Sequence, residues 1–309
     1  MSFNPNAEIR SDNVARSGGG GTGGGFRPGG GGLKVGGAGG CVILVVLLVL
    51  MMTGILSPGQ VMDLVAGGGT SQGQSGQGGV LEQCTSGADA NADDECLVQA
   101  TIESGDSLWA QLAPEAGWEF VEPQGIVFSQ SVQTGCGAAT ADVGPFYCPA
   151  DSTIYVDVDF FDSLTSRFGA DGGQLAKMYV VAHEYGHHVQ YLSGAMQSAD
   201  RSGTGPQSDA VRLELQADCY AGVWAHHASA TTDDQGQPML APLTDEDIAS
   251  ALSAASAVGD DHIQGDVAGG QVNPESWTHG SSEQRQHWFT VGYSEGTVQA
   301  CDTFAVDEV

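Results

Sequence analysis

The chain has 309 residues and a formal net charge of −29 at pH 7, with 38 Asp and Glu against nine Lys and Arg. Such a negative surface repels nucleic acid and anionic lipid headgroups, which argues against nucleic acid as a partner. Because the acidic residues are scattered along the chain, they indicate adaptation for solubility or high salt rather than an acidic site for basic substrates. The length leaves room for one sizeable catalytic domain with appendages.

Two glycine-rich stretches, Gly18–Gly40 and Gly67–Gly79, hold much of the chain's 47 glycines. Segments of this composition bury too little apolar surface to offset the entropy that they lose on ordering. We therefore expect residues 1–34 to be a disordered arm and residues 57–80 to be a flexible tether.

An uncharged apolar run from Cys41 to Leu56 lies between these stretches. With the small residues that precede it, the run reaches the roughly 20 residues that a helix needs to cross a bilayer. We therefore expect a transmembrane helix over residues 35–56. A buried core helix would have polar positions on one face, and this run has almost none. A cleaved signal peptide is the other alternative, although it would start nearer the N-terminus.

The basic residues predict the orientation of this helix. No Lys or Arg follows it until Arg167, whereas several precede it: Arg10, Arg16, Arg27 and Lys34. By the positive-inside rule, the N-terminus is then cytoplasmic and residues 81–309 form an extracytoplasmic domain. The expected protein is a single-pass protein of the cell membrane, with the lipid bilayer as a partner through residues 35–56.

The cysteines agree with an extracytoplasmic domain. Apart from Cys41 they are even in number, and an oxidising compartment allows all of them to pair. The sequence alone leaves the pairing open. We expect the two short-range pairs Cys84–Cys96 and Cys136–Cys148, which leaves Cys219–Cys301.

Residues 81–309 contain both strand-like and helix-like patterns. Short segments rich in β-branched residues predict strands over residues 126–132 and 153–158. Apolar residues at helical spacing, with capping signals at Thr244 and at Ser281 or Ser282, predict a series of helices. These helices cover residues 95–112, 160–168, 173–192, 206–228, 244–257 and 281–293. Strands followed by helices indicate an α+β fold, predominantly helical with a small sheet.

The helix expected over residues 173–192 contains an HExxH pattern, His183-Glu-Tyr-Gly-His187. Residues four apart on an α-helix differ by about 40° in azimuth and about 6 Å in height. Both imidazoles can therefore bind one Zn²⁺. Glu184 projects to the side of that face, where it can accept a proton from the water that the metal activates. The turn before His183 is apolar, which favours a buried functional site over two surface histidines.

A second pair, Glu214 and Asp218, lies one turn apart on the next expected helix. In this ExxxD arrangement, typical of gluzincins, Glu214 is the third metal ligand and Asp218 accepts the imidazole N–H of a ligand histidine. Three protein ligands leave a fourth position for water, as in catalytic zinc sites. Either carboxylate could reach the metal, and we assign Glu214 because its side chain is longer.

Further short motifs accompany these two. Together they cover residues 136–139, 144–149, 154–157, 182–190, 212–224, 259–261, 278–285 and 301–304. This set resembles the putative neutral zinc metallopeptidase family of bacterial membrane proteins, the YpfJ-like proteins, over nearly the whole of residues 81–309. The resemblance implies a zincin-like metallopeptidase domain with bound Zn²⁺.

His279 is a candidate for stabilising the oxyanion that forms on an attacked carbonyl. It stands just before an expected helix that contains Arg285, and a similar His and Arg occur near the end of related gluzincins. The alternative is that His279 caps the helix and that Arg285 pairs with Asp218 or Glu283.

Other polar residues are weaker candidates. Asp260 and Asp261 could bind a cation, but two carboxylates alone make a weak site. His188 points about 100° away from His187 and indicates a supporting or core position. The chain has no GxSxG elbow, which argues against a serine hydrolase.

The sequence therefore predicts a membrane-anchored zinc peptidase that hydrolyses a protein or peptide substrate. His183, His187 and Glu214 hold the metal, and Glu184 is the general base. One alternative is a surface-tethered, zinc-containing binding or scaffold protein without turnover, although such a protein has no need for Glu184. Another is a zinc hydrolase that attacks a cell-wall amide.

Overall fold

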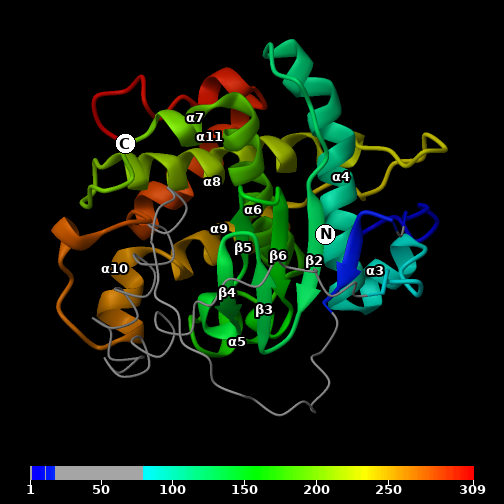
Figure 1. Cartoon of the computed structure of the whole chain (residues 1–309), viewed down its shortest axis with the longest axis horizontal. Coiled ribbons are helices and arrows are strands. Elements are labelled where there is room, and N and C mark those ends of the chain that lie inside the picture. The colour runs from blue at the N-terminus through cyan, green and yellow to red at the C-terminus, as the bar shows by residue number, and fades with distance from the viewer. Residues whose placement is uncertain (1, 11, 18–78) are drawn as a thin grey trace, which may run out of the picture.

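The computed structural model describes residues 2–10, 12–17 and 79–309 (Figure 1). The transmembrane helix expected over residues 35–56, and all but the end of the tether expected over residues 57–80, lie outside the described residues. Within the described part, no helix is both long and apolar enough to cross a membrane.

A four-stranded sheet lies in the middle of the molecule, in the order β1-β2-β6-β5 (Figure 1). β1 (Val14–Arg16), β2 (Gln124–Phe128) and β6 (Thr153–Asp157) run parallel, whereas β5 (Phe146–Cys148) is antiparallel to β6. Every residue of β6 is buried, as expected for a central parallel strand covered on both faces. A separate hairpin pairs β3 (Ser131–Thr134) with β4 (Gly137–Thr140).

The helices make up most of the regular structure. In chain order they are α3 (Gly87–Ala92), α4 (Asp94–Glu115), α5 (Asp159–Ser166), α6 (Gln174–Ser193), α7 (Ala195–Ser198), α8 (Asp209–His227), α9 (Asp245–Ala257), α10 (Asp260–His262) and α11 (Ser282–Glu295). Short 3-10 segments are η1 (Ala141–Val143), η2 (Ala228–Ala230), η4 (Pro274–Ser276) and η5 (Val298–Cys301), and a π-helical turn, η3, spans Ile263–Val267. The molecule is thus a mixed helix and strand fold with small sheets.

Local signals in the sequence mark several helix boundaries correctly. Capping boxes form at Thr244 before α9 and at Ser281 before α11. The start of α8 differs from the expectation, because the helix begins after Ser208 instead of at Pro206. The Ser208 hydroxyl accepts the backbone N–H of Val211, so this side chain and not the proline ring determines where the helix begins. The single strand expected over residues 126–132 is instead split between β2 and β3.

Residues 2–10 and 12–17 are ordered, which contradicts the expectation of a disordered arm for this part of residues 1–34, whereas residues 18–34 lie outside the described residues. Residues 2–10 and 12–17 pack against the rest of the fold, and β1 is the edge strand of the central sheet. Phe3, Ile9 and Val14 are buried in the same core as the helices. The expectation of disorder came from the glycine-rich composition that starts at Gly18. That composition carries no information about the short apolar pattern that precedes it.

The metal-ligand candidates lie on α6 and α8, which pack against each other, and α11 packs along α8. Gly186, inside the HExxH pattern, lies where α6 packs closely against α8. A Cβ there would lie 2.9 Å from the backbone oxygen of Ala217. A larger residue would push α6 away from α8 and thereby separate the groups on the two helices.

All three expected disulfides are present. They join Cys84 to Cys96, Cys136 to Cys148 and Cys219 to Cys301. The last of these fixes α8 to η5 near the C-terminus, and the two short-range bridges hold the beginning of α4 and the strand β5.

Two buried carboxyl groups on α4 predict a pH-dependent stability. Burial raises the pKa of Glu103 to about 7 and that of Asp106 to about 7. The folded state then retains protons that the unfolded chain releases above about pH 4–5, so stability is highest below that range and falls as the pH rises through about 7. We expect the urea unfolding free energy to decrease between pH 5 and pH 8.

Glu103→Gln isolates this effect, because the amide keeps the size of the side chain and does not titrate. The slope of unfolding free energy against pH should be shallower in this variant, by at most about 1.4 kcal/mol per pH unit. An unchanged slope would show that Glu103 does not take up a proton on folding.

Candidate metal centre

α6 and α8 bring His183, His187 and Glu214 to one point. The Nε2 atom of His183 lies 3.2 Å from one Glu214 carboxylate oxygen, and the Nε2 atom of His187 lies 3.6 Å from the other. Potential ligand atoms of all three residues lie within 4.8 Å of one another. The helical spacing of the two histidines accounts for their common face, and the packing of α8 against α6 supplies the carboxylate.

The second nitrogen of each imidazole is also held. His183 Nδ1 lies 2.8 Å from an oxygen of Asp218, and His187 Nδ1 lies 2.8 Å from the side-chain oxygen of Gln190. Because a carboxylate or amide oxygen can only accept, both Nδ1 atoms carry a proton, and both Nε2 atoms point toward Glu214. Asp218 has the role expected from its ExxxD spacing, whereas Gln190, three residues after His187 on the same helix, was not expected in such a role.

Asp218 is the centre of a buried polar cluster. Its carboxylate accepts hydrogen bonds from Arg285, with Nε at 2.8 Å and Nη2 at 2.9 Å, and from the hydroxyl of Tyr179 at 2.5 Å. Although burial alone would raise the pKa of Asp218, the charges of Arg285 and His183 lower it overall. The carboxylate therefore stays ionised and holds His183 in place. Of the two roles considered for Arg285, the structure shows the pairing with Asp218.

The charge balance of the ligand groups suits a cation. Although burial opposes protonation, Asp218 and Glu214 raise the pKa of His183 to about 10. Burial likewise opposes ionisation of Glu214, yet the histidines hold its pKa well below the usual range. The carboxylates thus favour positive charge at this buried position, which a divalent ion can supply in place of protons. Two imidazole nitrogens and one carboxylate are a donor set of catalytic zinc sites.

A cleft of about 580 Å³ opens beside these groups. Glu184 lines it together with His183, His187 and Glu214. Its other walls come from the segment before and within β5, from the end of α5 and from the π-helical turn η3. Most of these wall residues are apolar: Val143, Phe146, Phe160, Phe168, Val258, Ile263 and Val267.

His279 also lines the cleft, and the Gly259-Asp-Asp261 motif holds it there. One oxygen of Asp260 accepts the backbone N–H groups of Thr278 at 2.8 Å, His279 at 2.7 Å and Gly280 at 3.0 Å. The other oxygen lies 3.5 Å from His279 Nδ1. Although burial lowers it, Asp260 and Glu214 raise the pKa of His279 overall. In the sequence, Asp260 was considered as part of a weak cation site. In the structure it instead fixes the loop that carries His279 by accepting its backbone N–H groups.

Three further histidines, His188, His226 and His227, do not belong to the ligand cluster. His188 Nε2 lies 2.7 Å from the carbonyl oxygen of Val121, and its Nδ1 lies 3.0 Å from the Tyr147 hydroxyl. Burial lowers the pKa of His188 to about 4, so the imidazole is neutral. His226 contacts the carbonyl of Tyr293 near the end of α11, and His227 contacts that of Gly296 just after it. These positions agree with the supporting role inferred for His188.

Substitution of Asp260 should show whether this residue positions and charges His279 or only stabilises the fold. Asp260→Asn keeps the size of the side chain but removes the charge beside His279, so the pKa of His279 should fall. If the protein hydrolyses peptides, we expect kcat to fall on the order of tenfold, since a weakened donor should matter less than a deleted one. The limb of the pH–rate profile that reports His279 should move to lower pH.

Asp261→Asn is the matched control, because Asp261 accepts hydrogen bonds from Ser282 instead of from His279. An identical pH–rate profile in Asp260→Asn and the unmodified protein would show that His279 takes no part in turnover.

Comparison with known proteins adds a family to this geometry. A family model described as "Putative neutral zinc metallopeptidase" matches residues 4–304. An uncharacterized protein of Mycobacterium tuberculosis, Rv2575, is 52% identical over 230 residues, which cover 74% of this chain and 77% of the relative. The uncharacterized protein YpfJ of Escherichia coli K12 is 38% identical over 236 residues, covering 74% and 78%. No solved structure is significantly similar to the chain.

Proposed function

Since the chain belongs to the putative neutral zinc metallopeptidase family, we propose that it is a zinc-dependent peptidase with a zincin-like site. His183, His187 and Glu214 would hold the metal, and Glu184 would act as general base. One observation supports this most directly: both histidine Nε2 atoms face the Glu214 carboxylate at the wall of a cleft that Glu184 also lines. Three protein ligands leave a coordination position for water or substrate.

The chain's own residues have distinct parts in this reaction. Bound zinc would supply Lewis acidity, polarising the scissile carbonyl and lowering the pKa of water. Glu184 accepts the proton of the attacking water and delivers it to the leaving amine. His279, whose Nδ1 faces Asp260, would donate from Nε2 in its imidazolium form to the oxygen that gains charge. Asp218 and Gln190 keep both ligand imidazoles in one tautomer.

The setting of the enzyme is the second part of the proposal. Three disulfides in one domain favour an oxidising compartment, so we place residues 79–309 outside the cytoplasm. The apolar run within residues 35–56 would hold the protein at the membrane, because apolar side chains favour the bilayer interior over water.

Metal content and peptide cleavage test the function together. The purified full-length protein should contain about one zinc per chain and cleave members of a mixed peptide library, with loss of cleavage on chelation and recovery on adding zinc. Zinc-containing protein that cleaves no peptide would favour the scaffold alternative. Release of fragments from cell wall but not from peptides would favour the amide hydrolase.

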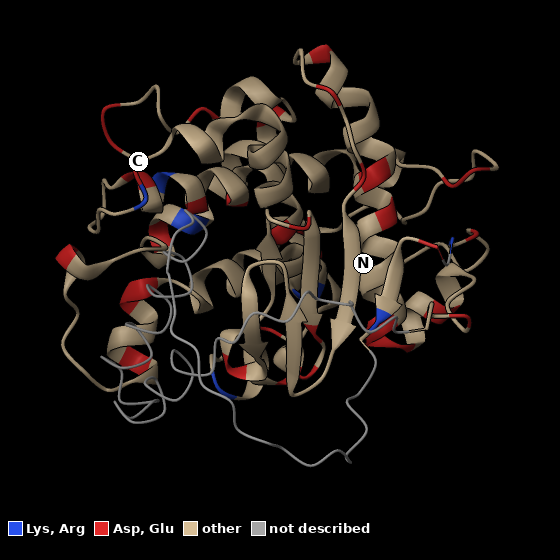
Figure 2. Ribbon diagram, in the orientation of Figure 1, with Lys and Arg blue, Asp and Glu red and all other residues tan. Residues whose placement is uncertain are grey.

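The cleft also predicts a substrate preference. Most charged residues in the molecule are acidic (Figure 2), yet Arg167 in the cleft wall forms no ion pair with any described residue. Its guanidinium carbon lies 5.3 Å from the centre of the Phe168 ring, beside the apolar wall. We therefore expect preference for a peptide that combines a bulky apolar side chain with a nearby carboxylate.

Arg167→Gln should lower kcat/KM for a peptide with Glu near the cleaved bond by about 2- to 5-fold and leave the matching Gln peptide unaffected, as expected for one solvent-exposed charge pair. Arg201→Gln is the matched control, because Arg201 is another arginine without an ion pair among the described residues and lies outside the cleft. Equal losses for both peptides would remove Arg167 from recognition of the charge.

A further inference from the structure

We propose that residues 2–17 are a structural part of the catalytic domain, so that the N-terminus lies on the same side of the membrane as residues 79–309. This differs from the single-pass topology expected from the basic residues, in which a membrane separates the two. The proposal does not depend on peptidase activity.

The two flanks of residues 18–78 are hydrogen-bonded to each other. The backbone N–H of Arg16 donates to the carbonyl of Gly79 at 3.0 Å, and Ala15 forms an antiparallel bridge with Val80. The N–H of Ser17 donates to the carbonyl of Val127 at 2.8 Å, which continues the pairing of β1 with β2. The chain therefore leaves the domain and returns to it at adjacent points.

Two glycines of the domain lie in close contact with this segment. A Cβ at Gly87 would lie 2.0 Å from the backbone oxygen of Asn4, and one at Gly125 would lie 2.8 Å from a methyl group of Val14. Only glycine leaves room for the N-terminal segment at these two places. The family match begins at residue 4 and so includes the same segment.

Polar groups on α4 depend on the segment as well. Gln99, Glu103 and Asp106 lie on one face of the helix and are buried, although such side chains are seldom buried without partners. Their partners come from the N-terminal segment. Gln99 donates to the carbonyl of Arg10, Glu103 accepts the N–H of Arg10 at 2.8 Å, and Asp106 accepts from Asn13 at 2.7 Å.

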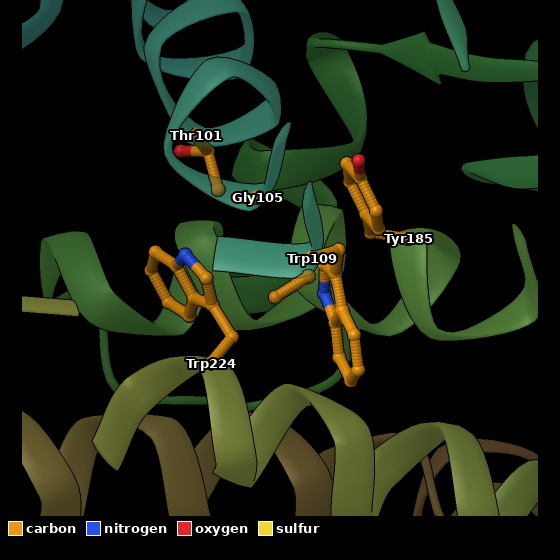
Figure 3. A pocket seen from close by; sticks show the side chains of 6 residues that line it. Thr101, Gly105, Trp109, Tyr185 and Trp224 are labelled. Atoms are coloured by element: carbon orange, nitrogen blue, oxygen red, sulfur yellow. The ribbon is translucent and has the colours of Figure 1, made fainter. Parts of the chain in front are cut away.

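This cluster extends to the helix that carries the metal-ligand candidates. The other oxygen of Asp106 accepts the hydroxyl of Tyr185 at 2.6 Å, and Tyr185 lies between Glu184 and Gly186 on α6. Figure 3 shows the Tyr185 ring beside Gly105 of α4, where a Cβ would lie 2.6 Å from the ring. If the N-terminal segment lay in another compartment, Glu103 would lose the Arg10 guanidinium and Asp106 would lose the side-chain amide of Asn13. Both carboxyl groups would then lack partners next to the active-site helix.

A membrane crossed once between residues 17 and 79 would separate β1 from β2 and break all of these contacts. The fold and the single-pass topology therefore exclude each other in one molecule. Ser17 and Gly79 must both lie on the side where the catalytic domain folds.

Thiol labelling in intact cells tests this directly. In a Cys41→Ser background, Asn6→Cys places an exposed thiol in the N-terminal segment, and Val121→Cys, at a side chain that is 54% exposed, reports the domain. A membrane-impermeant maleimide should label both variants to the same extent before the membrane is opened. Labelling of Val121→Cys alone, with Asn6→Cys reacting only after permeabilisation, would overturn the proposal.

A crosslink gives an independent result on the same chain. Ala15→Cys and Val80→Cys face each other across an antiparallel bridge, where Cβ atoms are about 4.5–5.5 Å apart and a disulfide is within reach. In the Cys41→Ser background the double variant should contain no free thiol when denatured without reduction, whereas Ala15→Cys alone should contain one. Two free thiols in the double variant would contradict the pairing.

Discussion

Replacement of Glu214 by alanine is expected to yield a protein that binds little zinc and hydrolyses no peptide. The Glu214 carboxylate lies between the Nε2 atoms of His183 and His187, at 3.2 and 3.6 Å. Its removal takes away one of the three proposed protein ligands and the one that α8 contributes to the cluster. Two imidazoles on one helix remain, which is too few for a tightly held catalytic zinc. Equilibrium dialysis against buffered zinc measures the loss.

Asp218 provides the comparison, because it lies one turn further along α8. It contacts the Nδ1 atom of His183, on the far side of the ring from Glu214. Loss of such an outer partner typically lowers metal affinity or activity by about 10–100-fold. Asp218→Asn should therefore keep bound zinc at saturating concentration but with weaker affinity. Because Arg285 then loses its buried ionic partner, the variant should also be less stable.

The two variants distinguish the carboxylates. If Asp218→Asn lost its zinc while Glu214→Ala kept wild-type affinity, the ligand assignment would be reversed. The gluzincin-type arrangement would then not apply to this chain.

Glu184→Gln is expected to abolish measurable hydrolysis while zinc content and melting temperature stay unchanged. Glu184 lines the cleft beside the ligand cluster but is not one of the three groups that converge on one point. The glutamine has nearly the same size and cannot accept the proton of the attacking water. Loss of a positioned general base typically lowers the rate by about 10²–10⁴-fold. The measurements are kcat/KM for a cleaved peptide and the zinc content of the same sample.

Glu283→Gln controls for the change in net charge, since Glu283 is an exposed residue in the first turn of α11, outside the cleft. This variant should keep its activity. Normal turnover by Glu184→Gln would exclude Glu184 from the mechanism, whatever the metal content.

Much of the local structure follows from short-range patterns. The spacing of His183 and His187 places both rings on one face because an α-helix repeats every 3.6 residues. The capping residues Thr244 and Ser281 mark helix starts for a similar reason, since each side chain bonds to a backbone group only three residues away. The two short-range disulfides were expected from the 12-residue separation of their cysteines, and Cys219–Cys301 was expected as the pair that remained.

The N-terminal segment shows where sequence patterns mislead. Glycine content is an average over many residues, and it predicted a disordered arm over residues 1–34. The structure instead pairs β1 with β2 and buries Phe3, Ile9 and Val14. Neither the partner strand nor the polar face of α4 lies near this segment in the sequence.

By itself the sequence determined which residues share a helical turn, and so which could form a metal site: the pairs His183–His187 and Glu214–Asp218. Only the tertiary structure decided that Glu214 faces the Nε2 atoms, that Asp218 binds Arg285, and that Asp260 holds His279. The physical reason is how far apart in the sequence the interacting groups lie. Bonds within one turn are set by backbone geometry, whereas contacts between α6, α8 and α11 depend on how closely the helices pack, which a residue such as Gly186 controls.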